Sequence, residues 1–187
     1  LSAGAERYSI SGGKKGTAQT IAEMQNLVTA GKREREVRNK LYEIIKDCTP
    51  KDYLCYAKSA YLFCRDQIRY VFDPAGVELI ENPKYILETK VADCDSICVL
   101  LATLCEQMGF PCRFVTIKAD LSRPDEYSHV YMQANIPKHG WVSMDCTMPN
   151  KEFGWEPDKQ FPRTYWPASK DAPESHEGDK MAGLGIV

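Results

Sequence analysis

The sequence lacks any long uninterrupted hydrophobic run. Hydrophobic residues make up 43% of the 187 residues, yet no apolar stretch approaches the length of about 18 residues that a membrane-spanning helix needs. Residues 1–17 also lack the apolar core of a signal peptide. We therefore expect no membrane partner and a cytoplasmic location.

An excess of positive charge is also absent, because 24 lysines and arginines face 26 aspartates and glutamates. The densest basic segment carries interleaved glutamates: Lys32, Arg33, Arg35, Arg38 and Lys40 stand among Glu34, Glu36 and Glu43. Such mixing favours a solvated helix face over a nucleic-acid patch. We expect no nucleic-acid partner.

The spacing of the cysteines favours buried thiols over a metal site. Cys94, Cys98, Cys105 and Cys112 lack the C-x2-C spacing that closes a tetrahedral zinc site, and no acidic loop of EF-hand form occurs. At about 100° per residue, Cys98, Leu101 and Cys105 share one helical face. We predict that Cys98, Cys105 and Cys112 are buried and unpaired, that all eight cysteines are reduced, and that the protein uses no metal or cofactor.

Apolar periodicity predicts helices first and strands later, which is an α+β arrangement. Helices are expected around 21–28 and 37–45 with a break near Gly31, at 51–68 with Thr49 as the N-cap, as a short turn at 85–88, and at 93–108 before Gly109. Strands are expected at 70–72, 113–119, 129–134 and 141–145. We divide the chain into a flexible arm (1–17), a domain (18–149) and an extension rich in proline and aromatic residues (150–187), expected to lack regular structure.

Cys94 stands at the start of the helix predicted at 93–108. A thiol attacks as the thiolate, and the positive end of a helix can lower its pKa. Unpaired N–H groups of a first helical turn can also bind a developing oxyanion. Taken alone, a cysteine here is more often an ordinary core residue.

The hairpin predicted after this helix favours a catalytic role for Cys94 over a role as a core residue. A loop centred on Pro137 would place His129 opposite Asp145 and Tyr131 opposite Ser143. Because side chains alternate along a strand, His129 and Asp145 would then share one face at about 5 Å between Cβ atoms. The carboxylate would orient the imidazole, and the imidazole would take the proton of Cys94.

Four segments carry a family resemblance. They are Ala92-Asp93-Cys94-Asp95-Ser96, Gly109-Phe110-Pro111-Cys112-Arg113-Phe114-Val115, Ser128-His129-Val130 and Gly140-Trp141-Val142-Ser143-Met144-Asp145. Over about residues 53–149 the chain resembles the transglutaminase-like superfamily of papain-like fold, in which a cysteine at the N-terminus of a central helix packs on an antiparallel sheet. The resemblance implies Cys94 as nucleophile, His129 as base and Asp145 as the orienting acid. It leaves unmatched the aromatic residue that supplies a second oxyanion donor in some members.

The resemblance also implies thiol-dependent acyl transfer through a thioester, on a protein or peptide substrate. Release by water makes a peptidase or amidase, as small microbial and viral members suggest, whereas release by a lysine amine makes a crosslinking transglutaminase. A further reading is a structural or virion-assembly protein on the same fold, with a vestigial or single-use triad. There, the N-terminal arm and the tail 180–187 would mediate self-association in assemblies such as phage particles.

Overall fold

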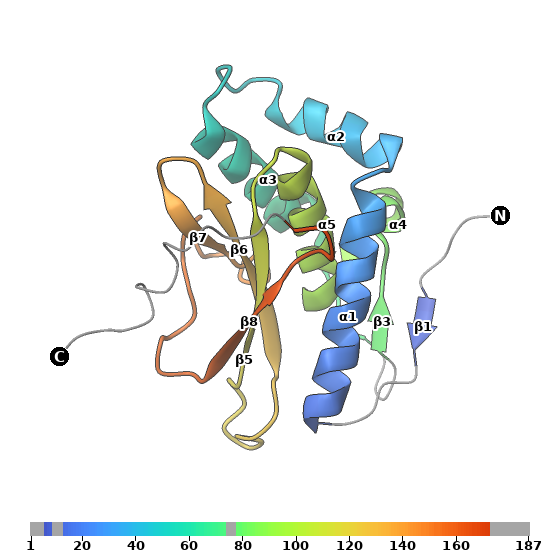
Figure 1. Ribbon diagram of the computed structural model, residues 1–187, viewed down its shortest axis with the longest axis vertical. Helices are drawn as coiled ribbons and strands as arrows, with labels where there is room; N and C mark the ends of the chain where they lie inside the picture. Colours follow the sequence, from blue (N-terminus) through green and yellow to red (C-terminus); the bar gives the residue numbers. More distant parts are fainter. Residues whose placement is uncertain (1–5, 9–12, 74–77, 173–187) are drawn as a thin grey trace.

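The computed structural model describes residues 6–8, 13–73 and 78–172, and its helices pack against one side of an antiparallel sheet (Figure 1). The helices are α1 (Gly13–Gly31), α2 (Arg35–Ile45), α3 (Tyr53–Gln67), α4 (Pro83–Thr89) and α5 (Cys94–Gln107). The strands are β1 (Glu6–Tyr8), β2 (Arg69–Tyr70), β3 (Glu78–Ile80), β4 (Val91–Ala92), β5 (Cys112–Ile117), β6 (His129–Ile136), β7 (Gly140–Met144) and β8 (Arg163–Pro167). The α+β class expected from the sequence is confirmed.

The main sheet has the strand order β7-β6-β5-β8, and all its neighbouring strands are antiparallel. Helix α5 packs on the face of this sheet that carries Phe114, Met132 and Ala134, all fully buried. Residues of α5 are buried around almost its whole circumference, because α1, α3 and α4 cover its other sides. The helix that begins with Cys94 is therefore the centre of the core.

Capping residues explain where α5 and α3 begin and end. The Asp93 side chain accepts a hydrogen bond from the Ser96 N–H at 3.0 Å, and Gly109 ends the helix with φ of 84°. The expectation that Thr49 caps α3 is wrong. Asp52 is the N-cap, and its side chain accepts a hydrogen bond from the Cys55 N–H. The helix therefore starts at Tyr53 rather than near Lys51, where φ is 68° and a helix cannot continue.

The extension 150–187 is not devoid of regular structure, contrary to expectation. Strand β8 joins the sheet beside β5, with Val115 opposite Tyr165 and Phe114 opposite Trp166. Its β-favouring Thr164, Tyr165 and Trp166 stand between two prolines, a composition that suits only the edge of a sheet. The domain boundary expected near residue 149 thus cuts off a strand of the sheet.

The N-terminal boundary also differs from the expected one. Residues 6–8, placed in the flexible arm, form β1 and pair with β3, and α1 already begins at Gly13. The tail 180–187, on which the assembly reading partly rested, lies outside the described residues. Across the ranges that the structure describes, no helix is long and apolar enough to cross a membrane.

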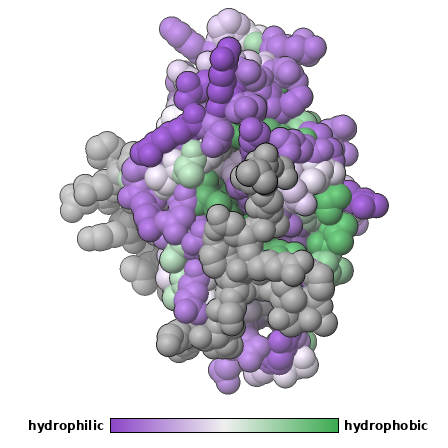
Figure 2. Space-filling view, turned by 90° about the vertical axis from the view of Figure 1, so that its right-hand side faces the viewer, coloured by the Kyte–Doolittle hydropathy of each residue, from purple (hydrophilic) through white to green (hydrophobic). Residues whose placement is uncertain are grey.

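The basic segment forms a solvated helix face, as its interleaved charges indicated. Arg35 and Arg38 are exposed on α2, while Val37 and Leu41 on the other side are buried. The upper part of the face shown in Figure 2 is mostly hydrophilic. Lys32 departs from this pattern, because its ammonium binds Glu106 at 2.8 Å and Asp171 at 2.6 Å.

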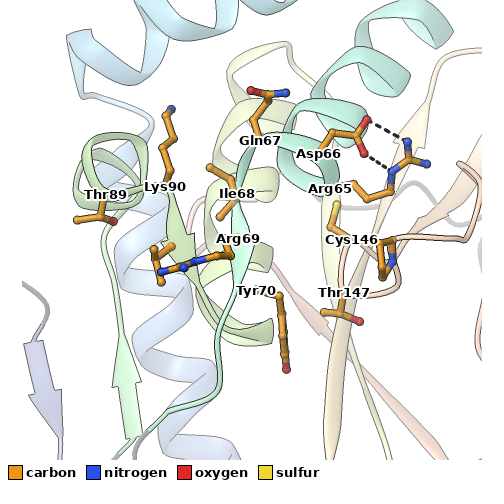
Figure 3. A pocket seen from close by; sticks show the side chains of 12 residues that line it. Arg65, Asp66, Gln67, Ile68, Arg69, Tyr70, Thr89, Lys90, Cys146 and Thr147 are labelled. Atoms are coloured by element: carbon orange, nitrogen blue, oxygen red, sulfur yellow. Dashed lines mark hydrogen bonds and ion pairs between the residues drawn. The ribbon is translucent and has the colours of Figure 1, made fainter.

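A short parallel pair brings the end of α3 to the start of α5. Strand β2 follows α3 directly and pairs with β4, which leads into α5, with Tyr70 opposite Ala92. The residues around this junction are drawn in Figure 3. Because both strands are only two residues long, their pairing depends on the helices that hold them.

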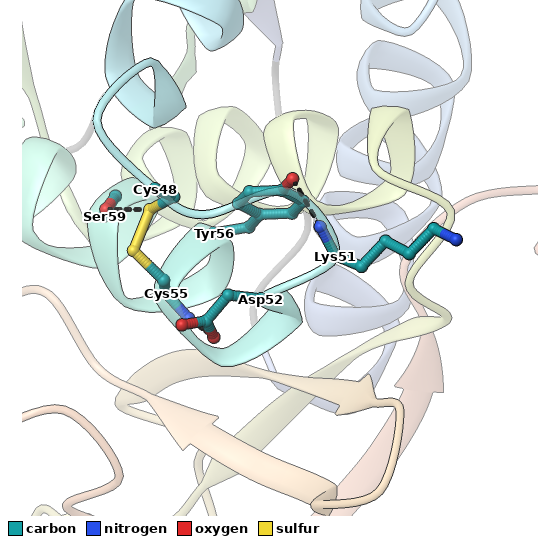
Figure 4. Close-up of a disulfide and its surroundings, with 6 residues drawn as sticks. All are labelled: Cys48, Lys51, Asp52, Cys55, Tyr56 and Ser59. Carbon is teal, nitrogen blue, oxygen red and sulfur yellow. Dashed lines mark hydrogen bonds between the residues drawn. A yellow bond between two sulfur atoms is a disulfide. The ribbon is translucent and has the colours of Figure 1, made fainter.

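Cys48 and Cys55 form a disulfide across the turn between α2 and α3 (Figure 4). The expectation that all eight cysteines are reduced is wrong for this pair. The tight turn capped by Asp52 brings the two Cα atoms to 5.8 Å, within the range a disulfide spans. The remaining cysteines are free, and Cys98, Cys105 and Cys112 are buried, as predicted.

We expect the double variant Cys48→Ser/Cys55→Ser to lose about 2 kcal/mol of unfolding free energy, because the bond closes only a short loop of the unfolded chain. Urea unfolding of both proteins, with and without reductant, measures the loss. Reductant should bring the wild type close to the variant and leave the variant unchanged. Rapid alkylation of Cys48 and Cys55 in unreduced, folded protein would show that the bond is absent.

Candidate active site

Cys94 is the first residue of α5, as the sequence predicted. Strand β4 ends two residues before Cys94, and the Asp93 side chain caps the first turn of the helix. The side chain is half-buried, whereas the other free cysteines are buried. Cys94 is therefore the free thiol of the described chain that a substrate can reach most easily.

His129 and Asp145 are in contact. The His129 Nε2 atom lies 2.8 Å from Asp145 Oδ2. The second oxygen of Asp145 accepts hydrogen bonds from the Thr147 N–H at 3.0 Å and the Thr147 hydroxyl at 2.7 Å. Burial would raise the pKa of Asp145, but the hydrogen bonds from His129 and Thr147 outweigh it and keep that pKa below its usual value. The buried carboxylate thus stays charged and holds the ring.

The register that joins these two residues differs from the predicted one. Gln133, not Tyr131, lies opposite Ser143, and Met132 lies opposite Met144. The hairpin is therefore shifted by two residues, and its turn contains Lys138 with φ of 71°. An even shift keeps every side chain on its face, so His129 still shares a face with Asp145. It reaches the carboxylate diagonally instead of directly across.

Cys94 begins the helix that runs beside the strand carrying His129, but in the described part of the chain it is not hydrogen bonded to His129 or Asp145. Cys98, one helical turn further on, has its sulfur 3.7 Å from the carbonyl oxygen of Val130, so the first turn of α5 runs beside the start of β6. Among the described residues, no hydrogen bond joins Cys94 to His129; the Cys94 thiol instead lies 3.4 Å from Asp95 Oδ1. In free enzymes such contacts are often long and tighten only with substrate.

The electrostatic setting of Cys94 does not favour a resting thiolate. Burial raises the pKa of the Cys94 thiol well above its usual value, and the neighbouring Asp95 and Asp93 carboxylates raise it further. This corrects the expectation that the helix N-terminus would lower it. Any attack by Cys94 at neutral pH therefore requires a base that removes the proton during the reaction.

Tyr70 is a residue of the site that sequence reasoning missed. Burial raises the pKa of its hydroxyl, and the adjacent Cys94 thiol and Asp93 carboxylate raise it further, so the group stays protonated. Its position depends on the pairing of β2 with β4, which sets Tyr70 opposite Ala92. The sequence predicted a strand here but gave no sign of its partner.

Acidic residues surround the start of α5. Burial raises the pKa of Asp93 to about 7 against the hydrogen bond from Ser96, and Asp73 and Glu81 add to the rise. One donor atom each from Asp93, Cys94 and Asp95 lies within 4.8 Å of the others. Ca²⁺ takes about six to eight oxygen ligands, so this set alone does not make a calcium site, and we assign no metal to it.

A family model described as the transglutaminase-like superfamily matches residues 39–146. No curated protein matches the chain. Solved structures are also similar to parts of it. A proposed cysteine protease from Cytophaga hutchinsonii is 15% identical, with a TM-score of 0.46 over 60% of this chain and 37% of that one. A proposed protease from Parabacteroides distasonis is 10% identical, with a TM-score of 0.50 over 67% and 26%.

The third structure is EGTA-treated LapG from Legionella pneumophila, 17% identical, with a TM-score of 0.43 over 71% of this chain and 74% of LapG. The chain spans well under half the length of the two proposed proteases that it resembles. At these identities the likeness concerns the fold alone.

Proposed function

Because the chain belongs to the transglutaminase-like superfamily, we propose that it is a thiol-dependent acyl-transfer enzyme that hydrolyses an amide bond in a protein or peptide. Cys94 is the nucleophile, His129 the base and Asp145 the residue that orients the base. The observation that carries the proposal is the 2.8 Å contact between His129, which begins β6, and Asp145, which follows β7. Strand β6 runs beside the helix that begins with Cys94.

In the proposed reaction His129 takes the proton of Cys94 as the sulfur attacks the carbonyl carbon. Because Nε2 of His129 is hydrogen bonded to Asp145, Nδ1 is the ring atom that accepts this proton. The tetrahedral intermediate collapses to a thioester, and the imidazolium gives its proton to the departing amine. Water, deprotonated by His129, then attacks the thioester, and the carboxylic acid and the free thiol are released.

Two donors are proposed for the oxyanion. One is the backbone N–H of Cys94, which belongs to the first turn of α5 and so has no partner inside the helix. The other is the hydroxyl of Tyr70, which stays protonated beside the thiol. Tyr70 would thus fill the role for which the sequence offered no candidate, and a donor of this kind acts most strongly where water is excluded.

Hydrolysis, rather than transfer to a lysine amine, is proposed because the base remains accessible to water. The His129 side chain keeps 16% of its surface exposed, whereas the Asp145 side chain is fully buried. Water can thus approach the ring that must activate it, while the charge that orients the ring is shielded. Crosslinking is the alternative acyl transfer, and peptide cleavage by the wild type favours hydrolysis over it. A vestigial site in an assembly protein is the other outcome of the labelling experiment below.

Labelling with a peptidyl acyloxymethyl ketone, a reagent that alkylates cysteine nucleophiles, tests the proposal. We expect the label on Cys94 alone, located by mass spectrometry, and no label in Cys94→Ser. The matched control is Cys98→Ser, which removes a buried thiol one turn along α5 and should leave labelling intact. Loss of peptide cleavage in Cys94→Ser completes the test. Slow labelling of Cys94, at the rate of the buried cysteines, would indicate a vestigial site.

A further inference from the structure

The carboxylate of Asp145 is held at both of its oxygen atoms. Oδ2 lies 2.8 Å from His129 Nε2, whereas Oδ1 accepts hydrogen bonds from the Thr147 N–H at 3.0 Å and from the Thr147 hydroxyl at 2.7 Å. A hydroxyl that donates to an ionised carboxylate forms one of the stronger kinds of hydrogen bond in proteins. A single residue, Thr147, therefore supplies both of these hydrogen bonds to the oxygen that faces away from the imidazole.

The charge of Asp145 depends on these hydrogen bonds. Its side chain is fully buried, and a buried carboxylate has lost the water that would otherwise stabilise its charge. Other ionisable side chains that interact with it electrostatically are Tyr61, Cys98 and Cys146. None of these side chains can carry a positive charge. The hydrogen bonds from His129 and Thr147 are what keep the pKa of Asp145 below its usual value against its burial.

Thr147 is itself held in place by contacts of its neighbours with α3. The preceding residue, Cys146, has its sulfur 3.6 Å from the carbonyl oxygen of Tyr61 on α3. Further along the same segment, the carbonyl oxygen of Lys151 accepts a hydrogen bond from the Tyr61 hydroxyl at 3.0 Å. In Figure 3 the Cys146 sulfur points towards α3, and Thr147 follows in the loop. The segment 146–151 is thus attached to the helix on both sides of Thr147, which gives the carboxylate a fixed partner.

The orientation of the Asp145 carboxylate determines which nitrogen of His129 carries the proton. With Oδ1 bound to Thr147, the carboxylate resists rotation about its Cβ–Cγ bond, and Oδ2 stays on Nε2. This contact keeps the proton of the neutral ring on Nε2 and leaves Nδ1 as the acceptor. Without the Thr147 hydroxyl, the backbone N–H would be the one remaining donor to Oδ1, and the carboxylate would turn more freely.

We propose that Thr147 is a positioning residue: its hydroxyl fixes the Asp145 carboxylate so that Oδ2 holds the Nε2–H tautomer of His129. The proposal rests on the proposed function, in which Nδ1 of His129 must be free to take the proton of Cys94. Thr147 acts through Asp145 and His129 and is not itself a catalytic residue. Its role resembles that of the aspartate one step closer to the reaction, which orients the base without taking its proton.

The tautomer of His129 tests the proposal without any reaction at Cys94. Long-range ¹H–¹⁵N spectra of protein labelled with ¹⁵N-histidine, recorded at a pH where the ring is neutral, show which nitrogen is protonated. We expect one Nε2–H tautomer in the wild type and a mixture of tautomers in Thr147→Val, which keeps the backbone N–H and the shape of the residue but not its hydroxyl. Thr147→Ser keeps the hydroxyl and should retain the wild-type tautomer. An unchanged tautomer in Thr147→Val would overturn the proposal.

The ionisation of Asp145 gives a second measurement on the same variants. A hydrogen bond to the charged form of a carboxyl group lowers its pKa. Removal of the Thr147 hydroxyl should therefore raise the pKa of Asp145, whereas Thr147→Ser should leave it low. The signal of the Asp145 carboxyl carbon, followed by ¹³C NMR as pH is lowered, measures this pKa. The same pKa in Thr147→Val and the wild type would show that the hydroxyl does not hold the carboxylate.

The rate of Cys94 labelling by the acyloxymethyl ketone measures the effect on the reaction. Thr147→Val should slow labelling about tenfold, because a hydrogen bond to a charged group is lost, and Thr147→Ser should restore the rate. The matched control is Thr89→Val. Thr89 lines the same cavity of 580 Å³ as Thr147, but its hydroxyl donates to the carbonyl oxygen of Tyr85 at 2.9 Å, so its loss should change neither the rate nor the tautomer. A Thr147→Ser protein as slow as Thr147→Val would overturn the proposal.

The spectroscopic and labelling experiments fail independently. A changed His129 tautomer in Thr147→Val together with unreactive Cys94 in the wild type would support the positioning of His129 by Thr147 and reject the proposed enzyme. Specific labelling of wild-type Cys94 together with an unchanged tautomer and rate in Thr147→Val would support the enzyme and reject the role of Thr147.

Discussion

Replacing His129 with alanine is expected to slow the alkylation of Cys94 by the acyloxymethyl ketone by about 10²- to 10⁴-fold, the range for loss of a general base. The reason is the raised pKa of the Cys94 thiol: without a base, almost none of it is ionised at neutral pH. Exposure of the thiol should change little, so the loss measures proton transfer and not access. The rate of Cys94 labelling by the acyloxymethyl ketone is measured at pH 7 for the wild type and the variant.

Two further variants sharpen this result. His139→Ala removes the exposed histidine of the β6–β7 turn and should leave the rate unchanged. Asp145→Asn keeps the shape of the orienting residue but removes its charge, and should lower the rate by less than His129→Ala does. Because the pKa of Asp145 lies below its usual value, the wild-type pair should persist as pH falls until that carboxylate is protonated. Equal rates in His129→Ala and the wild type would remove His129 from the mechanism.

Replacing Tyr70 with phenylalanine is expected to lower kcat for peptide cleavage by about 10²- to 10³-fold with little change in KM, as for loss of one oxyanion donor. The ring of Tyr70 remains in place, so ground-state binding is kept. Only the hydroxyl beside the thiol is lost. Steady-state kinetics of peptide cleavage measure both constants.

Tyr42→Phe serves as the control, because it removes a hydroxyl from a ring that is 61% exposed on α2. An increase of kcat in Tyr70→Phe would contradict the proposal. It would mean that the hydroxyl holds the thiol in its resting state and must leave before attack.

The two-residue error in the hairpin register shows which part of the site was predictable. Alternation of side chains places His129 and Asp145 on one face for any even shift, so the face followed from the local pattern alone. The position of the turn, in contrast, depends on the backbone energy of the loop residues. Lys138, with φ of 71°, occupies the turn, although nothing in its type favours that conformation over one centred on Pro137.

The cysteines show a similar division. Burial of Cys98 and Cys105 followed from their helical spacing, because the face that carries them is apolar throughout. The bond between Cys48 and Cys55 did not, because it depends on how sharply the chain turns at Asp52. The sequence also could not predict that the pKa of Cys94 is raised. The rise comes first from burial, which depends on the residues packed around the thiol and not on its place in the helix.

The sequence by itself determined the helix that begins with Cys94, its end at Gly109, the three consecutive strands β5 to β7 and the face shared by His129 and Asp145. These features arise from caps, periodicity and alternation, which act between residues close in the chain. Only the tertiary structure decided that β8 completes the sheet and that β2 pairs with β4 to set Tyr70 beside Cys94. Each of these joins segments far apart in sequence, and their pairing depends on the burial and hydrogen bonding of the whole core rather than on any local preference.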